Sequence, residues 1–419
     1  MSRLDELIQE LCPNGVEYKT VSSISKNITS GGTPKTGVAE YYNGDIPWLR
    51  TQEVNFDDIT DTGVKITQLG VDNSSAKWIP ENCVIVAMYG ATVGKVAINK
   101  IPMTTNQACC NIELDKEKAL YRYVFHCLCN QYQYIKSLGQ GSQTNINAQI
   151  VKKLTIPVPP LEVQSEIVRI LDNFTELTAE LTAELTARKK QYEHYRNKLF
   201  SFNALNCAVV GNSLNNIIVM PLGEIGELVR GNGLQKKDLI NNGVPAIHYG
   251  QIYTYYGVYT DKTISFVSSQ TAMKLRKVIY GDVIITNTSE NIEDVGKAVT
   301  YLVKEQGVTG GHATIFKPSE KILGKYLTYY TQTDNFARQK RIYAKGTKVI
   351  DLSTSDLAKI KIPVPPIEEQ RRIVSILDKF DMLTTSISEG LPKEIELRRK
   401  QYEYYRNQLL SFPDNKATA

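Results

Sequence analysis

The side chains that most often do chemistry are scattered along this chain of 419 residues. An amino-methyltransferase would carry a D/N/S-P-P-Y/F/W motif, but the only Pro-Pro pairs stand in Val-Pro-Pro-Leu and Val-Pro-Pro-Ile. No GxxxxGK[ST] loop for ATP is present. The spacing from Asp282 to Glu293, Asp294 and Lys297 does not suit a nuclease centre, and the four histidines are dispersed. The sequence therefore predicts a non-catalytic protein with no catalytic residues.

The cysteines do not form a metal-binding pattern. Seven are present, an odd number, and the close pairs Cys109-Cys110 and Cys127-Leu-Cys129 lack the CxxC-like spacing of a zinc site. We expect reduced core thiols, no metal and no cofactor in this chain. The net charge of +5 permits a nucleic-acid partner without requiring one.

The elements that must position any functional residues follow from an internal duplication. Residues 156–174 read IPVPPLEVQSEIVRILDNF and residues 362–380 read IPVPPIEEQRRIVSILDKF, identical at 13 of 19 positions. Residues 188–202 read RKKQYEHYRNKLFSF and residues 398–412 read RRKQYEYYRNQLLSF, identical at 11 of 15. The offsets, 206 and 210, make the second copy four residues longer.

The duplication predicts an alternating layout. A first domain (1–155) precedes a spacer (156–202), a second domain (203–361) precedes a second spacer (362–413), and a tail covers 414–419. The two domains share only short matches: residues 93–97 resemble 295–299, and residues 46–49 correspond to 244–247. We expect two similar scaffolds that carry different surfaces.

Each spacer is predicted to be a long helix. The Pro-Pro pairs can stand only at a helix start, and apolar residues then recur in steps of three and four, as in a coiled coil. Without Gly or Pro in residues 161–202, the first helix would be about 60 Å long. Gly390-Leu391-Pro392 should kink or break the second. The two stripes favour antiparallel pairing within one chain, and a dimer of two chains through the same stripes is the alternative.

Residues 175–187 read TELTAELTAELTA, with Thr-Ala-Glu-Leu units at 178–181 and 182–185. A four-residue unit does not match the helix period, so adding or removing one rotates the helix ends and changes the length by about 6 Å. We interpret the unit as setting spacer length, through Thr178, Leu181, Thr182 and Leu185. A helix-favouring low-complexity stretch is the alternative.

The two repeated spacer blocks and the TAEL units strongly resemble the DNA-specificity subunits of type I restriction-modification systems, in particular the type IC branch. The close resemblance covers about 100 residues, and the two-domain arrangement extends it over nearly the whole chain. It implies two target-recognition domains on antiparallel helices, each reading one half of a split site in double-stranded DNA. It also implies two methylation subunits that modify adenine, together with restriction subunits. S-adenosylmethionine, ATP and Mg would belong to those partners.

Residues for DNA contact are predicted from chemistry, because neither domain matches the family residue by residue. Arg, Lys, Asn, Gln and hydroxyl side chains read base edges and hold phosphates. In the first domain we expect contacts from Thr33, Lys35, Arg50, Gln52, Tyr89, Asn106, Gln107, Gln143 and Asn145. In the second domain we expect them from Arg230, Lys236, Lys237, His248, Tyr249, Gln251, Asn287, His312, Lys345 and Lys348.

Basic and aromatic residues of the spacers are expected either to contact the methylation subunits or to be structural: Arg188, Tyr192, Arg196, Arg398, Tyr402 and Arg406. The predicted fold class is α+β, two mixed α/β domains joined by two long antiparallel helices. No apolar run of 18 residues and no signal peptide is evident, so we expect a cytoplasmic protein without a membrane span. A coiled-coil scaffold without a DNA role and a self-sufficient nuclease-methylase are the rival interpretations.

Overall fold

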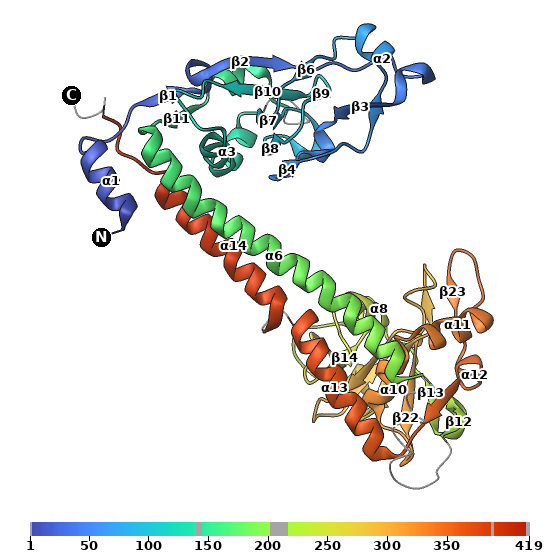
Figure 1. Cartoon of the computed structure of the whole chain (residues 1–419). Helices are drawn as coiled ribbons and strands as arrows, with labels where there is room; N and C mark the ends of the chain where they lie inside the picture. Colours follow the sequence, from blue (N-terminus) through green and yellow to red (C-terminus); the bar gives the residue numbers. More distant parts are fainter. Residues whose placement is uncertain (1, 140–144, 202–216, 387–388, 416–419) are drawn as a thin grey trace. The chain divides into compact units, whose positions relative to one another are not determined.

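The computed structural model describes residues 2–139, 145–201, 217–386 and 389–415. They form two compact units (Figure 1). Unit 1 combines residues 1–180 with residues 395–419, and unit 2 is the continuous segment 181–394. Each unit therefore holds one sheet-rich domain together with parts of both spacers.

Unit 1 contains two main sheets. The five-stranded sheet has the order β2 (Ser25–Ser30), β10 (Cys109–Leu114), β7 (Val84–Ala87), β8 (Val96–Asn99), β4 (Asp58–Ile59). The four-stranded sheet has the order β5 (Lys65–Ile66), β3 (Tyr42–Leu49), β9 (Met103–Thr105), β6 (Trp78–Ile79). A third pair joins β1 (Tyr18–Thr20) to β11 (Thr155–Pro157). The helices of this domain are α1 (Arg3–Leu11), α2 (Gln68–Asp72), α3 (Tyr121–Asn130), α4 (Tyr132–Ser137) and α5 (Ala148–Lys153).

Unit 2 repeats this topology. Its five-stranded sheet has the order β13 (Gly226–Arg230), β22 (Ala313–Pro318), β18 (Val283–Thr286), β20 (Ala298–Tyr301), β15 (Tyr259–Thr260). Its four-stranded sheet has the order β16 (Ser265–Val267), β14 (Val244–Ile247), β21 (Gly307–Thr309), β17 (Arg276–Val278). Two short pairs join β12 (Ile218–Pro221) to β24 (Lys361–Val364) and β19 (Thr288–Ser289) to β23 (Ile350–Asp351). The helices are α8 (Tyr249–Thr254), α9 (Ser269–Lys274), α10 (Gly324–Tyr330), α11 (Asp334–Tyr343) and α12 (Thr354–Leu357).

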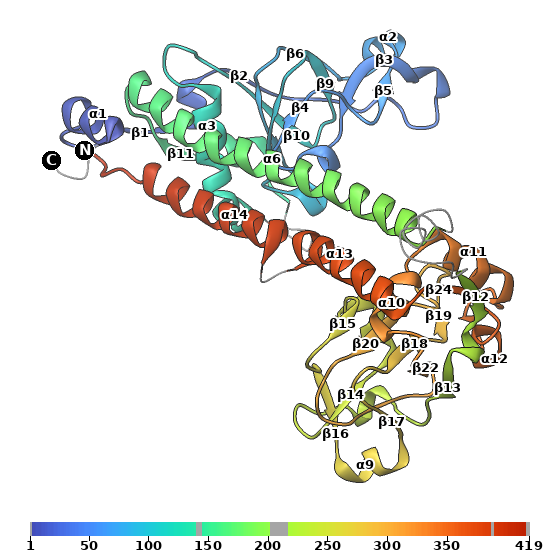
Figure 2. The ribbon, with the colours of Figure 1, turned by 60° about the horizontal axis from the view of Figure 1, so that its bottom comes forward.

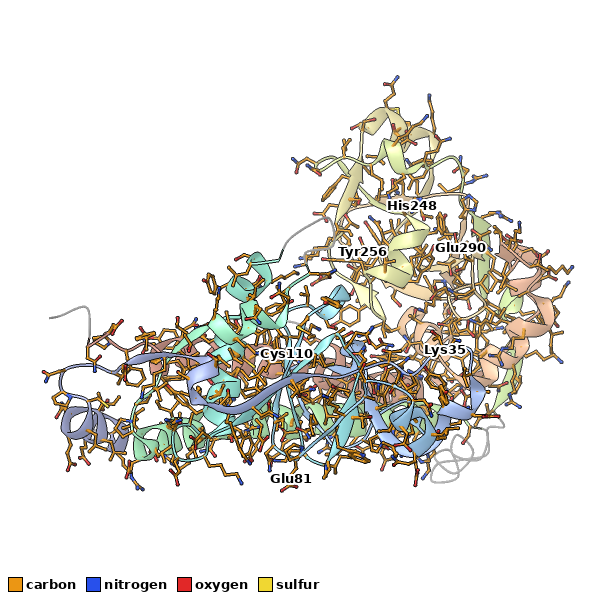
Figure 3. All side chains as sticks on the ribbon, turned by 90° about the horizontal axis from the view of Figure 1, so that it is seen from above. Lys35, Glu81, Cys110, His248, Tyr256 and Glu290 are labelled. Atoms are coloured by element: carbon orange, nitrogen blue, oxygen red, sulfur yellow. The ribbon has the colours of Figure 1, made fainter. Side chains whose placement is uncertain are left out.

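The central strands explain why both domains fold the same way. β7 reads Val-Ile-Val-Ala and β18 reads Val-Ile-Ile-Thr, and every residue of both is buried. Runs of β-branched residues buried on both faces are typical of strands in the middle of a layered domain. Six cysteines among the described residues are buried free thiols, as expected for core thiols. Cys110 on β10 is one of them (Figure 3).

The first spacer is a single helix, α6 (Leu161–Leu199), which begins directly after the predicted Pro-Pro start. The second spacer is two helices, α13 (Ile367–Thr385) and α14 (Gly390–Leu409), so the predicted break is confirmed. Gly390 has φ +78°, and a Cβ there would lie 2.5 Å from the Met382 carbonyl oxygen. Glycine is therefore needed at the point where the helix of the second copy is interrupted.

Within each unit, segments of the two spacers pack side by side (Figures 1 and 2). In unit 1, Phe174 on α6 stacks on Tyr405 of α14 with ring centroids 5.3 Å apart. In unit 2, Tyr192 and Tyr195 of α6 stack on Phe380 of α13 at 6.0 and 5.7 Å. The predicted intramolecular pairing is confirmed, and so is the fold class. No helix in the described part of the chain has the length and apolarity to cross a membrane.

Candidate nucleic-acid interface

In the first domain, several loops are joined by hydrogen bonds into loop cluster 1, defined as residues 31–35, 50–53, 89–92, 105–108 and 145. The backbone N–H of Gly32 donates to the Thr105 carbonyl at 2.9 Å, and that of Asn106 donates to the Leu49 carbonyl at 2.9 Å. The Thr33 hydroxyl donates to the side-chain oxygen of Gln107. The C-terminal ends of strands β2, β3 and β9 therefore lie next to one another.

Two further contacts complete loop cluster 1. The Thr92 hydroxyl donates to the Thr51 carbonyl at 2.7 Å, and the Gly90 N–H donates to the Asn145 side chain at 3.4 Å. The structure thus brings together the predicted contact residues of the first domain that lie on these loops. Those exposed to solvent are Thr33, Lys35, Gln52, Tyr89 and Gln107. Gln143 lies outside the described residues.

Arg50 is presented by a short capped turn. Its backbone N–H donates to Glu53 Oε1 at 3.3 Å, and its guanidinium Nε lies 3.6 Å from the same oxygen. With the Gln52 amide oriented to satisfy its neighbours, its oxygen accepts from Arg50 Nη1 and Nη2 at 3.2 and 3.3 Å. The turn therefore holds a cation and an amide next to each other, a donor set suited to base edges and phosphates.

In the second domain, loop cluster 2 comprises residues 230–231, 248–251, 287–289, 310–313 and 345–351. The Gly231 N–H donates to the Ala313 carbonyl at 2.9 Å, and the Asn287 N–H donates to the His312 carbonyl at 2.8 Å. Arg230 Nε donates to the Gly311 carbonyl at 3.0 Å. Lys345 pairs with Asp351 and so closes the turn that carries Lys348, and Asp351 also pairs with Thr288 of β19.

The two clusters occupy equivalent positions on the duplicated scaffold. β3 pairs in parallel with β9 at Leu49–Thr105, and β14 pairs in parallel with β21 at Ile247–Thr309. The Met88 N–H donates to the Ala108 carbonyl just as the Asn287 N–H donates to the His312 carbonyl. These registers confirm the correspondence of residues 46–49 with 244–247. The side chains that follow differ, Arg50-Thr-Gln-Glu in one domain and His248-Tyr-Gly-Gln in the other.

Two predicted contact residues of loop cluster 2 have structural partners instead. Asn287 is fully buried; its Nδ2 donates to the Leu352 carbonyl at 2.6 Å and its Oδ1 accepts from Thr314 at 2.9 Å. Gln251 accepts from the His248 N–H at 3.0 Å and donates to Ser265 at 2.6 Å. Both side chains therefore hold loops in place. Lys236, Lys237, His312, Lys345 and Lys348 are exposed.

Of the residues that join the first domain to its helix pair, Tyr402 and Arg406 were predicted as subunit contacts or structural residues, and the others were not predicted. Asp172 of α6 accepts from Arg122 Nη2 at 2.6 Å and lies 2.8 Å from His126 Nε2. His126 Nδ1 lies 2.9 Å from the Tyr402 hydroxyl of α14. Arg406 donates to the Asn130 side chain at 3.2 Å. We call Asp172, Arg122, His126 and Tyr402 the unit 1 anchor.

Burial and hydrogen bonds compete in the unit 1 anchor. Burial alone would raise the pKa of the Asp172 carboxyl, but the hydrogen bonds from His126 and Arg122 outweigh it and lower that pKa. Burial lowers the pKa of the His126 imidazole by more than its bond to Asp172 raises it. The anchor is therefore a carboxylate held between a guanidinium and a neutral imidazole.

Unit 2 has the corresponding anchor. Asp378 of α13 accepts from Lys325 Nζ and from the Tyr329 hydroxyl, both at 2.7 Å. Arg196 of α6 donates to the Gln332 side chain at 2.9 Å, and Tyr192 is buried. In both units an aspartate at the same place in one spacer copy accepts hydrogen bonds from the domain, and an arginine of the other copy donates to a side chain of that domain.

These contacts with the two domains give a structural reason why the aspartate and the arginine recur in both repeated blocks. Of the two roles expected for Tyr192, Arg196, Tyr402 and Arg406, the structure supports the structural one. The signal that could have found the anchors was a charged residue repeated at the same place in an apolar stripe. Among the described residues, no group of three or more His, Cys, Asp or Glu side chains is placed to hold a metal ion.

Comparison with known proteins agrees with this architecture. The family model for the type I restriction modification DNA specificity domain matches twice, at residues 13–188 and 216–397. The EcoR124I/EcoR124II specificity subunit of Escherichia coli is 36% identical over 310 residues, which are 71% of this chain and 72% of that protein. The EcoprrI specificity subunit of Escherichia coli is 29% identical over 422 residues, 93% of each chain.

Solved structures share the fold at low sequence identity. A chain from a study of assembly and conformational transition in the type I R-M system is 19% identical with a TM-score of 0.61, covering 96% of this chain and 98% of that one. The HsdS subunit from Thermoanaerobacter tengcongensis is 18% identical with a TM-score of 0.50, covering 96% and 97%.

The two family-model matches and the similarity to the Escherichia coli specificity subunit define the class: the chain belongs to the type I restriction-modification DNA specificity family. Within that family it is a specificity subunit with two specificity domains, and such subunits are non-catalytic.

Proposed function

We propose that this chain reads a bipartite, asymmetric DNA site, with loop cluster 1 on one half and loop cluster 2 on the other. The observation that carries the proposal is the equivalence of the two clusters. The same strand registers present Arg50 in one domain and His248 in the other. Recognition of two unlike half-sites requires different side chains at the same positions of a duplicated scaffold, as in loop clusters 1 and 2.

The chemistry on the DNA is assigned to partners. Two methylation subunits would modify adenine with S-adenosylmethionine, and restriction subunits would cut DNA with ATP and Mg. This chain would position them in the cytoplasm, where the DNA lies.

The TAEL units are proposed to set the gap between the half-sites, as the resemblance to the type IC branch suggests. The TAEL units lie within the uninterrupted helix α6. The boundary between compact units 1 and 2 falls between Glu180 and Leu181, within the first TAEL unit. Because both units share this helix, four residues more or less would change the distance along it by about 6 Å. That distance is close to two base-pair steps, since each step of B-DNA rises about 3.4 Å.

Methylome sequencing of cells that carry this chain with its methylation partner tests the proposal. The wild type should give a split motif, and deletion of residues 182–185 should shorten the gap while both half-sites stay the same. Replacing Thr182, Glu184 and Leu185 by Ala keeps the helix length and should leave the gap unchanged. If an active methylation partner yields no motif, the scaffold interpretation is correct instead.

A further inference from the structure

The second domain carries an aromatic cluster in loop cluster 2. The ring of Tyr249 contacts two imidazoles, with its centroid 4.5 Å from that of His248 and 4.9 Å from that of His312. His248 and Tyr249 come from the turn after β14, and His312 comes from the loop after β21. His312 is exposed, and the other two are partly exposed. Figure 3 shows where His248 lies.

Among the described residues, the hydrogen bonds of the His248 and His312 rings involve Nδ1 and leave Nε2 of each ring without a partner. His248 Nδ1 accepts from the Gly250 N–H at 3.2 Å. A nitrogen that accepts a backbone N–H carries no proton, so the neutral ring must carry its proton on Nε2. His312 Nδ1 forms a hydrogen bond with the Thr288 hydroxyl at 2.9 Å.

The charged groups around His248 support the neutral form. Burial lowers the pKa of the His248 imidazole, and His312 and Lys236 lower it further. Protonation would also place a second N–H against the Gly250 N–H. His248 Nε2 therefore remains a hydrogen-bond donor at neutral pH.

A rigid support holds the cluster. The Gln251 carboxamide accepts from the His248 N–H, and the buried Asn287 backbone N–H donates to the His312 carbonyl at 2.8 Å. The equivalent support exists in the first domain, where Glu53 accepts from the Arg50 N–H. Position 50 and position 248 are thus the same scaffold position with different readout chemistry.

We propose that His248, Tyr249 and His312 determine the specificity for one half-site, with His248 Nε2–H donating to an acceptor on a base edge in the major groove. Guanine N7 and O6 and thymine O4 are the acceptors that such a donor can reach there. Tyr249 provides an apolar face beside the imidazoles, which suits contact with a base edge or a thymine methyl. This inference rests on the proposed function and names the residues that read the half-site of the second domain.

The experiment uses the full chain assembled with its methylation partner on a plasmid library randomised over both half-sites. The wild-type motif is determined first by sequencing modified adenines. His248→Ala should reduce selectivity at one or two positions of one half-site by roughly 5- to 100-fold, the usual range for loss of a base-edge contact. His248→Gln, which keeps an N–H donor, should retain part of the preference.

Tyr280→Ala is the matched control. Tyr280 is also an exposed aromatic residue of the second domain, but it comes before the start of β18, whereas residues 287–289 of loop cluster 2 come after the end of that strand. This variant should keep the wild-type motif. The readout is base preference at defined positions, so a variant that only lowers overall methylation does not mimic the effect.

The outcomes separate the two claims. A wild-type protein without a split motif would overturn the proposed function. A split wild-type motif that keeps both half-sites in His248→Ala, Tyr249→Ala and His312→Ala would overturn this inference alone. Changes in both half-sites at once would also contradict it, because the cluster belongs to one domain.

Discussion

Replacing Asp172 tests how the first domain is held to its helix pair. The carboxylate accepts from Arg122 at 2.6 and 3.1 Å and lies 2.8 Å from His126. Asp172→Asn keeps the shape but removes the charge. Breaking a buried ion pair costs about 3–5 kcal/mol, but here the side chains of Arg122 and Asp172 remain 20% and 24% exposed. Arg122 also keeps Asp58 at 2.8 Å. We therefore expect Asp172→Asn to lower the free energy of unfolding of unit 1 by about 2–3 kcal/mol.

Hydrogen exchange measured by mass spectrometry resolves this loss by unit. Peptides of α3 and of residues 161–180 should exchange roughly 30- to 150-fold faster wherever their exchange requires opening of unit 1, since each 1.4 kcal/mol is a factor of ten. Peptides of residues 217–386 should be unaffected.

Two variants serve as controls for this experiment. Glu184→Gln removes an exposed ion pair with Arg188 at 3.4 Å and should cost about 0.5 kcal/mol or less. Asp378→Asn should move the effect to unit 2. The reasoning is refuted if Asp172→Asn is no more damaging than Glu184→Gln, or if it accelerates exchange equally in both units.

Three further results are expected. Because burial lowers the pKa of the His126 imidazole, the unfolded chain below about pH 6.5 binds a proton that folded unit 1 does not. The stability that neutral His126 contributes is therefore complete above about pH 6.5 and declines toward pH 5. His126→Gln should flatten that region of a urea-unfolding series against pH, whereas the lowered pKa of Asp172 affects stability only below about pH 4. Gln164→Leu removes a buried amide that accepts from the Leu120 N–H at 2.9 Å and donates to the Lys118 and Pro159 carbonyls. In the same assay it should lower the free energy of unfolding by about 2–4 kcal/mol, whereas Gln68→Leu, at an exposed position, should lower it by less than about 0.5 kcal/mol. Lys345→Ala with Lys348→Ala should make the slope of log affinity for DNA against log salt less steep by up to about 1.8, and an unchanged slope would remove this turn from the interface.

The spacer helices could be predicted because their signals are local. Proline pairs mark the helix starts, the apolar steps of three and four give the stripe, and Gly390 with Pro392 marks the break. The duplication added the pairing of two stripes within one chain. The helix α6 nevertheless ends at Leu199, before the predicted boundary at residue 202.

The loop clusters and anchors could be predicted only in part, because they depend on long-range pairing. The polar types around Arg50 and His248 were evident, but the parallel registers that bring residues 105–108 and 310–313 beside them were not. Asn287 has the right chemistry for a base contact, and only its burial under the Leu352 segment shows a supporting role. The contact between His126 and Tyr402 spans 276 positions, so no local pattern could indicate it.

The two units also differ in how the chain enters them, and this affects the order in which a growing polypeptide can finish folding. Unit 2 is one continuous segment, whereas unit 1 needs Leu410 and Phe412 in its core and the Pro413 carbonyl as acceptor for the Val16 N–H. During synthesis the first domain to emerge is therefore the last to be completed. A chain that stops before residue 395 leaves that domain with an uncovered apolar surface, which would mark the incomplete product for chaperones or proteolysis.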